Sequence, residues 1–198
     1  MREEASGALG DYLEVIGHLA AEGPPSHIFG GFADDALLEG RSTRRHGDLD
    51  VLVASDDLDA QFDRFDAMGF ASFRPLFEPV PGRPLVYGAF DRELHVDIGV
   101  YDRDPDGSIW FVLPWKDATY RVTLPDGALA YPVGTIDGVA IRTISPLAQY
   151  LMRETFLLTG TFGLPRPTDA SMQRRLRERF LSHLADDELR PTLTAYRG

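Results

Sequence analysis

Apolar residues recur along this chain with two periods, one typical of helices and one typical of strands. A return every three or four positions gives a helix one apolar face, whereas alternation or a short apolar run indicates a strand. The first pattern predicts helices over residues 8–21, 32–38, 56–68, 145–158, 169–184 and 187–196. The second predicts strands over residues 27–30, 48–54, 85–90, 93–101, 109–113, 118–124 and 135–141.

Turn-forming and capping residues support these boundaries. Gly40 follows the second predicted helix, where a glycine often ends a helix, and Ser55 is placed to cap the third. Asp91-Arg92 separates two predicted strands and indicates a hairpin. The resulting order of elements predicts a mixed α/β first part and a largely helical C-terminal part, joined near residues 142–146.

Length and composition are those of an ordinary globular protein. The 198 residues can bury a sizeable core, in one domain or in two small ones. The chain has no cysteine, which excludes disulfides, thiolate catalysis and Cys-ligated zinc. No apolar run reaches the roughly 18 residues that a membrane span needs. The first residues carry acids where a signal peptide has basic residues, so a cytoplasmic location is expected.

The net charge of −11 is concentrated in the first half of the chain. Of the 31 acidic residues, 22 precede residue 107, together with only 9 of the 20 basic residues. An acidic surface repels a phosphate backbone and attracts cations, which disfavours nucleic acid and favours a polyamine-like partner. Solubility alone also accounts for such a charge.

Two carboxylates crowd one side of a predicted strand. Asp48 and Asp50 lead the apolar run 51–53, and residues two apart in a strand share a side. Like charges side by side repel each other unless a cation lies between them. Asp97 interrupts another apolar strand, where a lone carboxylate is costly to bury, and strand pairing would bring it to the same place. The alternative is that Asp97 and His95 both face solvent.

A phosphate-binding turn precedes these carboxylates. Gly30-Gly31 stands between a predicted strand and a predicted helix, where backbone N–H groups can approach phosphate oxygens. Three carboxylates at a sheet edge form a hard oxygen site suited to Mg²⁺, whose remaining ligands are water and substrate phosphates. The spacing of the Gly pair, the Asp-x-Asp strand and the later acid therefore favours metal-dependent phosphate chemistry.

The segment GGFADDALLEGRSTRRHGDLDVLV resembles the minimal nucleotidyltransferases of the polymerase-β-like superfamily. It is most similar to the aminoglycoside 2″-nucleotidyltransferases and the small lincosamide nucleotidyltransferases. Their pattern is a Gly pair, a helix with Asp-Ala-Leu, and then Thr-Arg-x-His-x-Asp-x-Asp, and the stretch 138–146 also resembles them. The matching residues are Gly30, Gly31, Asp35, Thr43, Arg44, His46, Asp48 and Asp50.

The resemblance implies an α+β nucleotidyltransferase fold, with a five-stranded mixed β-sheet flanked by helices. Residues 1–142 would form the catalytic domain, and residues 143–198 a helical part that closes the cleft. The implied reaction is Mg²⁺-dependent transfer of a nucleoside monophosphate from an NTP, with ATP favoured, to a hydroxyl group, with release of pyrophosphate.

The resemblance also assigns roles to the matching residues. Asp48 and Asp50 would bind the metal, for which two ions are expected, and Asp97 would be a third ligand or the general base. The remaining positions near the triphosphate are Gly30, Gly31, Arg44 and His46.

The chain departs from the family pattern at three places. Phe32 stands where Trp is more usual, and Glu39 looks like an insertion before the loop. Thr168 replaces a Lys that could contact a phosphate, so Arg166 or Arg174 is expected to substitute for it.

Other charged residues have simpler expected roles. Asp34 is expected in solvent, and Asp35 is expected to hold the loop that carries Arg44 through a hydrogen-bonded pair. His46 would either orient that loop or touch substrate. The basic run at 174–179 is expected to be a solvated helix face.

The expected acceptor is a small-molecule antibiotic, an aminoglycoside before a lincosamide, because negative charge attracts a cationic drug. Two alternatives stay open: a toxin–antitoxin-type nucleotidyltransferase acting on tRNA or protein, and a non-catalytic scaffold of the same fold. Neither a nucleic acid nor a membrane is the expected partner, and a homodimer is left open. The acids expected to contribute to the attracting field are Asp57, Asp59, Asp102, Asp104 and Asp106.

Overall fold

A mixed β-sheet with helices on both faces forms the framework of the protein, in a computed structural model that describes residues 2–21, 23–91, 94–161 and 167–197. The helical elements are α1 (Arg2–Ala21), α2 (Gly30–Leu38), a 3₁₀ turn (Ser55–Asp57), α3 (Leu58–Ala67), α4 (Pro146–Thr159), α5 (Pro167–Leu176) and a π-helical turn (Arg177–Leu181). The strands are β1 (His27–Ile28), β2 (Leu49–Ala54), β3 (Ser72–Phe77), β4 (Val86–Phe90), β5 (His95–Arg103), β6 (Ile109–Trp115), β7 (Ala118–Leu124), β8 (Gly134–Ile136), β9 (Val139–Ile141) and β10 (Thr192–Ala195).

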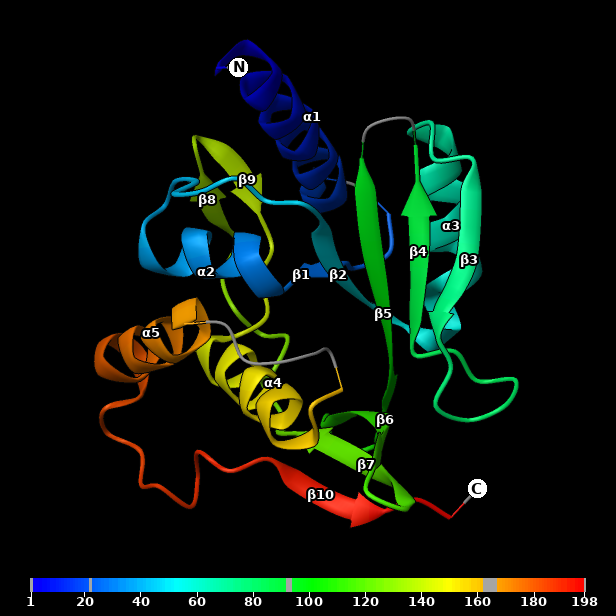
Figure 1. The fold of residues 1–198 in the computed structure, drawn as a ribbon, viewed down its shortest axis with the longest axis vertical. Helices are drawn as coiled ribbons and strands as arrows, with labels where there is room; N and C mark the ends of the chain where they lie inside the picture. The colour runs from blue at the N-terminus through cyan, green and yellow to red at the C-terminus, as the bar shows by residue number, and fades with distance from the viewer. Residues whose placement is uncertain (1, 22, 92–93, 162–166, 198) are drawn as a thin grey trace.

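The main sheet has eight strands and two halves that meet at β5. One half has the order β3-β4-β5-β2-β1, in which β2 and β5 are parallel and the other neighbours are antiparallel. This half is the expected five-stranded mixed sheet. The last residues of β5 pair with β6, which leads to β7 and β10 in the lower part of Figure 1. The α+β prediction is confirmed, and the sheet is larger than expected.

The alternation of side chains along β2 separates the core from the opposite face of the sheet. Leu49, Val51 and Val53 are fully buried and pack with residues of α1, α2 and α3. Since neighbouring residues of a strand face opposite sides, Asp50 and Leu52 face the side on which α4 packs, and Leu52 belongs to the core cluster that includes α4. The functional face of the sheet therefore looks toward α4.

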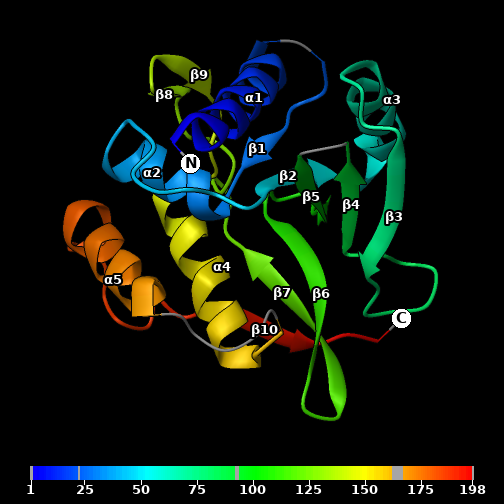
Figure 2. The ribbon, with the colours of Figure 1, turned by 45° about the horizontal axis from the view of Figure 1, so that its top comes forward.

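Helix α4 begins and ends as its sequence predicts. The Ser145 hydroxyl accepts a hydrogen bond from the backbone N–H of Ala148 at 3.2 Å, and Pro146 occupies the first turn. Gly160 ends the helix with a φ of +66°, a conformation that costs glycine little. Figure 2 shows α4 between α5 on one side and β6 and β7 on the other.

In the C-terminal segment, one predicted helix is wrong. Residues 187–196 do not form a helix; Thr192–Ala195 forms β10, antiparallel to β7, with Thr192 opposite Thr123. β-Branched threonines suit a strand, and the open edge of β7 provides the partner. The helix predicted over 169–184 is α5 followed by the π-helical turn. The boundary between residues 142 and 143 stays a prediction.

Two local predictions are also wrong. The single strand expected over 135–141 is a hairpin, β8 and β9, whose turn residues Asp137 and Gly138 have φ values of +48° and +81°. Asp-Gly is a preferred sequence for such a turn. Ser55 begins the 3₁₀ turn instead of capping α3, and its hydroxyl donates to Asp102 at 2.6 Å.

The predicted β4–β5 hairpin is confirmed, but residues 92–93 of its connection lie outside the described residues. Gly40 follows α2 with a φ of +67°, as expected of a glycine that ends a helix.

Candidate active site

A cleft of about 550 Å³ lies where β2, β5, the start of α2, the following loop and α4 meet. It collects every residue that the sequence predicted for the site. Those residues are Gly30, Gly31, Arg44, His46, Asp48, Asp50 and Asp97. The other polar lining residues are Arg45, Gln149, Arg153 and Asp169, and the apolar lining is Phe29, Leu52, Leu85, Val86, Phe111, Met152, Phe156 and Leu157.

The pairing of β2 with β5 brings two of the carboxylates together. Asp50 and Asp97 are directly opposite each other in the parallel register, and the exposed Asp48 lies two residues before Asp50. Burial raises the pKa of the Asp97 carboxyl, and the negative charge of Asp48 raises it further, whereas His95 opposes the rise. A raised pKa means that the charged form lacks enough compensating positive charge, as expected where a cation would bind.

His95 lies beside Asp97, as their shared parity on β5 predicted. Its Nε2 is 2.8 Å from Asp97 Oδ1, but neither atom has a well-directed hydrogen bond among the described residues. The ring stacks on Phe90 with 4.5 Å between centroids, and the backbone N–H of His95 donates to the Tyr12 hydroxyl at 3.3 Å. The alternative of a solvent-facing Asp97 does not describe this side chain, which is 25% exposed and lines the cleft.

Both glycines of the Gly pair are required by close neighbours. A Cβ on Gly30 would lie 2.0 Å from Asp50 Oδ2, and the φ of Gly30 is +65°. A Cβ on Gly31 would lie 2.6 Å from His46 Nδ1 and 3.0 Å from Arg44 Nη2. Only glycine lets the turn approach these side chains so closely.

The turn is also held from α4, through a residue that sequence reasoning missed. The Gln149 amide accepts from Gly30 N–H at 3.2 Å and donates to the Gly30 carbonyl at 2.9 Å. The Gly30 N–H is therefore already engaged. The N-cap residue Phe29 makes no side-chain hydrogen bond to the N–H groups that follow in α2. An uncapped helix start has N–H groups that suit an anion.

Asp35 fixes the loop between α2 and β2, as predicted, and its partners are Thr43 and His46. Its carboxylate accepts from the Thr43 backbone at 2.9 Å and from the Thr43 hydroxyl at 2.5 Å, and lies 2.8 Å from His46 Nε2. Burial acts to raise the pKa of Asp35, but the hydrogen bonds from His46 and Thr43 outweigh it and lower that pKa. The His46 ring stacks on Phe32, with 4.0 Å between centroids.

Asp34 was expected in solvent, and that prediction is wrong. The residue is 1% exposed, and its carboxylate accepts from Gln149 at 2.9 Å and from Arg153. The signal in the sequence is weak: Gln149 and Arg153 are four apart on α4, so they share a helix face. Nothing in the sequence relates them to a residue more than a hundred positions earlier.

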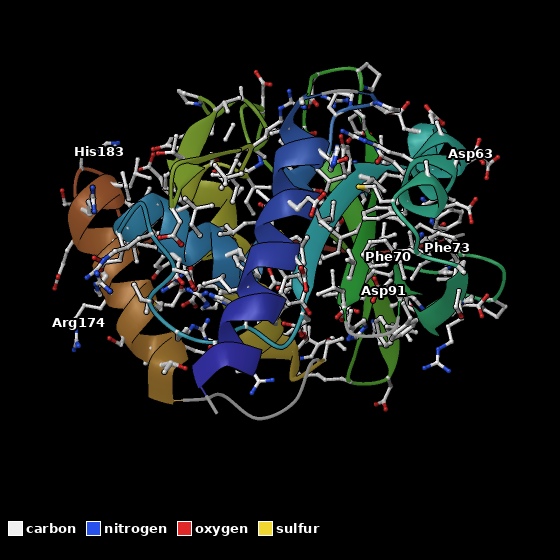
Figure 3. The ribbon with its side chains drawn as sticks, turned by 90° about the horizontal axis from the view of Figure 1, so that it is seen from above. Asp63, Phe70, Phe73, Asp91, Arg174 and His183 are labelled. Atoms are coloured by element: carbon white, nitrogen blue, oxygen red, sulfur yellow. The ribbon has the colours of Figure 1, made fainter. Side chains whose placement is uncertain are left out.

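Of the two residues expected to substitute for the missing Lys at position 168, the described one, Arg174, is not among the residues that line the cleft. Arg174 is exposed, and Figure 3 shows its side chain at the outer edge of α5, directed away from the protein. Arg166 lies outside the described residues. Asp169, next to Thr168, does line the cleft.

The basic run at 174–179 spans the end of α5 and the π-helical turn, and it is largely exposed, as expected; three of its arginines also have partners. Arg175 pairs with Glu39, the residue that looked like an insertion, and Arg177 pairs with Asp186. Arg179 donates to the Leu38 carbonyl at the C-terminus of α2. The run therefore helps to join the C-terminal part to α2.

The excess negative charge lies away from the cleft. None of the five acids expected to contribute to an attracting field is among the lining residues. Asp102 pairs with Arg83, and Asp104 pairs with Arg121. The described lining combines four acids with three arginines and a broad apolar wall, so its charge is nearly balanced.

Comparison with known proteins identifies the fold as the nucleotidyltransferase fold. The structure is similar to the solution structure of the antibiotic-resistance factor ANT(2″)-Ia, with a TM-score of 0.61 and 19% identity over 91% of this chain and 87% of that one. The complex of ANT(2″)-Ia with adenylyl-2″-tobramycin gives 0.60 and 18% identity over 91% and 92%. The lincomycin-bound lincosamide antibiotic adenylyltransferase LnuA gives 0.54 and 17% identity over 86% and 95%.

Sequence comparison adds no closer relative. No protein-family model matches the chain, and no curated protein sequence is significantly similar to it. At these identities the solved structures establish the fold alone. Within the described residues, no helix combines the length and apolarity needed to cross a membrane.

Proposed function

We propose that this protein transfers a nucleoside monophosphate from an NTP, ATP first, to a hydroxyl group of a small-molecule antibiotic and releases pyrophosphate. The observation that carries the proposal is the cross-strand pair Asp50 and Asp97, in one cleft with Asp48 and the Gly30 turn. The similar solved structures support this kind of reaction, since they are named as an antibiotic-resistance factor and an antibiotic adenylyltransferase.

Asp48, Asp50 and Asp97 would hold Mg²⁺, for which two ions are expected from the resemblance. Their carboxylate oxygens are the ligands that Mg²⁺ prefers. Asp97 suits the role because its buried Oδ1 has only the poorly directed contact with His95 Nε2, at 2.8 Å, among the described residues. Gly30 supports this assignment, because a larger residue in its place would displace the Asp50 carboxylate from the site. In the described part of the chain no three acidic or His side chains already form a metal site, so these side chains must turn toward one another.

The residues of the cleft have separate tasks in this reaction. When bound, Mg²⁺ offsets the negative charge of the phosphates and polarises their oxygens. Arg44 offers N–H groups to the phosphates beside the start of α2, and its Nε has no partner among the described residues. Asp97 would be either the third metal ligand or the general base that accepts the proton of the acceptor hydroxyl, and in the second role its raised pKa would make it a stronger base. His46 positions the loop through Asp35.

The acceptor is proposed to be an aminoglycoside or a lincosamide, each supported by a different observation. The net charge of −11 favours attraction of a polycationic aminoglycoside over long range. The nearly balanced charge and the apolar wall of the cleft favour the less charged lincosamide in direct contact.

One assay separates these acceptors and tests the reaction itself. The protein is incubated with Mg²⁺, ATP labelled on the α-phosphate, and a panel of aminoglycosides and lincosamides. Nucleotidylated drug and pyrophosphate should form in equal amounts. Asp50→Asn should abolish the product, whereas Asp63→Asn, an exposed aspartate on α3 (Figure 3), should not.

Two other outcomes would contradict the proposed function. Labelled tRNA or protein, with no labelled drug, would favour the toxin–antitoxin alternative. No Mg²⁺-dependent nucleotide binding at all would leave a non-catalytic scaffold.

A further inference from the structure

Helix α4 contributes a cation to the cleft. Arg153 is the only basic residue of α4, all of which the structure describes, and it lines the cleft with a side chain that is 13% exposed. A guanidinium retains its charge when it is this strongly buried, so it must have an anionic partner.

The partner within the protein satisfies only part of Arg153. Its Nη2 donates to the buried Asp34 carboxylate. Its Nη1 is buried and has no hydrogen-bond partner among the described residues. A buried N–H without an acceptor is unfavourable, which indicates that another acceptor completes the set when the cleft is occupied.

The position of Arg153 indicates what that acceptor is. Gln149, one turn earlier on the same helix, holds both backbone groups of Gly30, and Asp34 lies one turn into α2. Arg153 thus contacts α2 one turn after its start, near the end at which the helix dipole favours anions. Arg44 approaches the first turn beside Gly31, and it lines the same cleft as Arg153.

We propose that Arg153 binds the triphosphate of the nucleotide and supplies from α4 the positive charge that the Lys missing at position 168 does not provide. This inference rests on the proposed function. It places the nucleotide between α2 and α4, with Arg44 and Arg153 as its two cationic contacts. The carboxylates of β2 and β5 are then left for metal and acceptor.

The test is the affinity for MgATP, measured by calorimetry on the full chain without acceptor. Arg153→Met should weaken binding by about 10- to 100-fold, the usual loss of a charge-assisted contact to phosphate. Arg153→Lys should recover part of the lost affinity for MgATP. Arg121→Met is the matched control, because it removes an arginine paired with an aspartate outside the cleft, and it should leave the affinity unchanged.

A double variant separates phosphate binding from a purely structural ion pair. Arg153→Met alone leaves the Asp34 charge buried and unpaired, which destabilises the fold, whereas Asp34→Asn with Arg153→Met removes both charges. If Arg153 contacts phosphate, the double variant folds and still binds MgATP weakly. Affinity restored to the wild-type value in the double variant would overturn the inference alone. Absence of MgATP binding by the wild-type protein would overturn the proposed function and this inference together.

Discussion

Replacement of Gly30 by Ala tests whether the turn before α2 exists to make room for a carboxylate. The added Cβ would lie 2.0 Å from Asp50 Oδ2 and 2.8 Å from its Cγ. Nonbonded carbon contacts are comfortable at about 3.5–4.0 Å, so the Asp50 side chain must turn away. Its own Cβ is 3.2 Å distant, so β2 itself needs to move little. We therefore expect a local loss of site geometry in a folded protein.

Gly40→Ala supplies the matched control. Gly40 lies at the other end of α2 with a φ of +67°, against +65° for Gly30, and its added Cβ would meet only the Thr135 carbonyl at 3.9 Å. Both variants carry the same backbone strain, about 1–2 kcal/mol. Only Gly30→Ala adds the steric overlap with Asp50, so its free energy of unfolding should fall by about 2–4 kcal/mol.

The two variants, Gly30→Ala and Gly40→Ala, should differ more in activity than in stability when both are expressed as free energies. A misplacement of about 1 Å in a reacting constellation costs about 100-fold in rate. Drug nucleotidylation by Gly30→Ala should therefore fall by about 100-fold or more, and Gly40→Ala should retain wild-type activity within a few-fold. Chemical denaturation gives the stabilities, and pyrophosphate release gives the rates. Activity of Gly30→Ala near that of the wild type, or an equal loss in both variants, would refute the reasoning.

Three further predictions concern the metal ligands, the loop and acid sensitivity. Asp48→Asn should abolish turnover and leave thermal unfolding unchanged, and activity within tenfold of wild type would remove the residue from the site. Asp35→Ala should lower activity and expose the Arg44 loop to proteolysis, because three contacts of that loop are lost; an unchanged cleavage pattern would contradict this. Burial, with the nearby Arg142 charge, lowers the pKa of His27 to about 4 from 6.5. The unfolded chain therefore binds the proton first, and stability should fall as the pH drops from about 6.5 toward 4, by about 2–3 kcal/mol at pH 4.5. Urea unfolding of wild type and His27→Gln at pH 7.5 and 4.5 measures this, and an equal decrease in both proteins would exclude His27 as the cause.

The site could be predicted where local periodicity determines the outcome. Asp50 on β2 and Asp97 on β5 line one cleft with Asp48, which comes just before β2. His95 lies beside Asp97 because strand geometry places residues two apart on the same face. The Gly pair was recognisable because it stands between a predicted strand and a predicted helix, and in the structure its neighbours leave no room for a Cβ.

Long-range partners were not predictable from the same patterns. Arg153 and Asp34 are 119 positions apart, and nothing local distinguishes a buried, paired aspartate from a solvated one. β10 was mistaken for a helix because four residues are too few to establish a period, and its stability comes from pairing with the edge of β7. The turn at Asp137 and Gly138, in contrast, carried a readable Asp-Gly signal.

The parallel register of β2 with β5 also has a consequence for folding. Residue 50 on β2 pairs with residue 97 on β5, and Gln149, 119 positions after Gly30, holds the Gly30 turn. Pairings between distant segments form late, because the entropy of closing long loops is lost before the contacts form. During refolding, nucleotide binding should therefore appear later than helical structure. The recovery of binding then reports when the contacts between distant segments have formed.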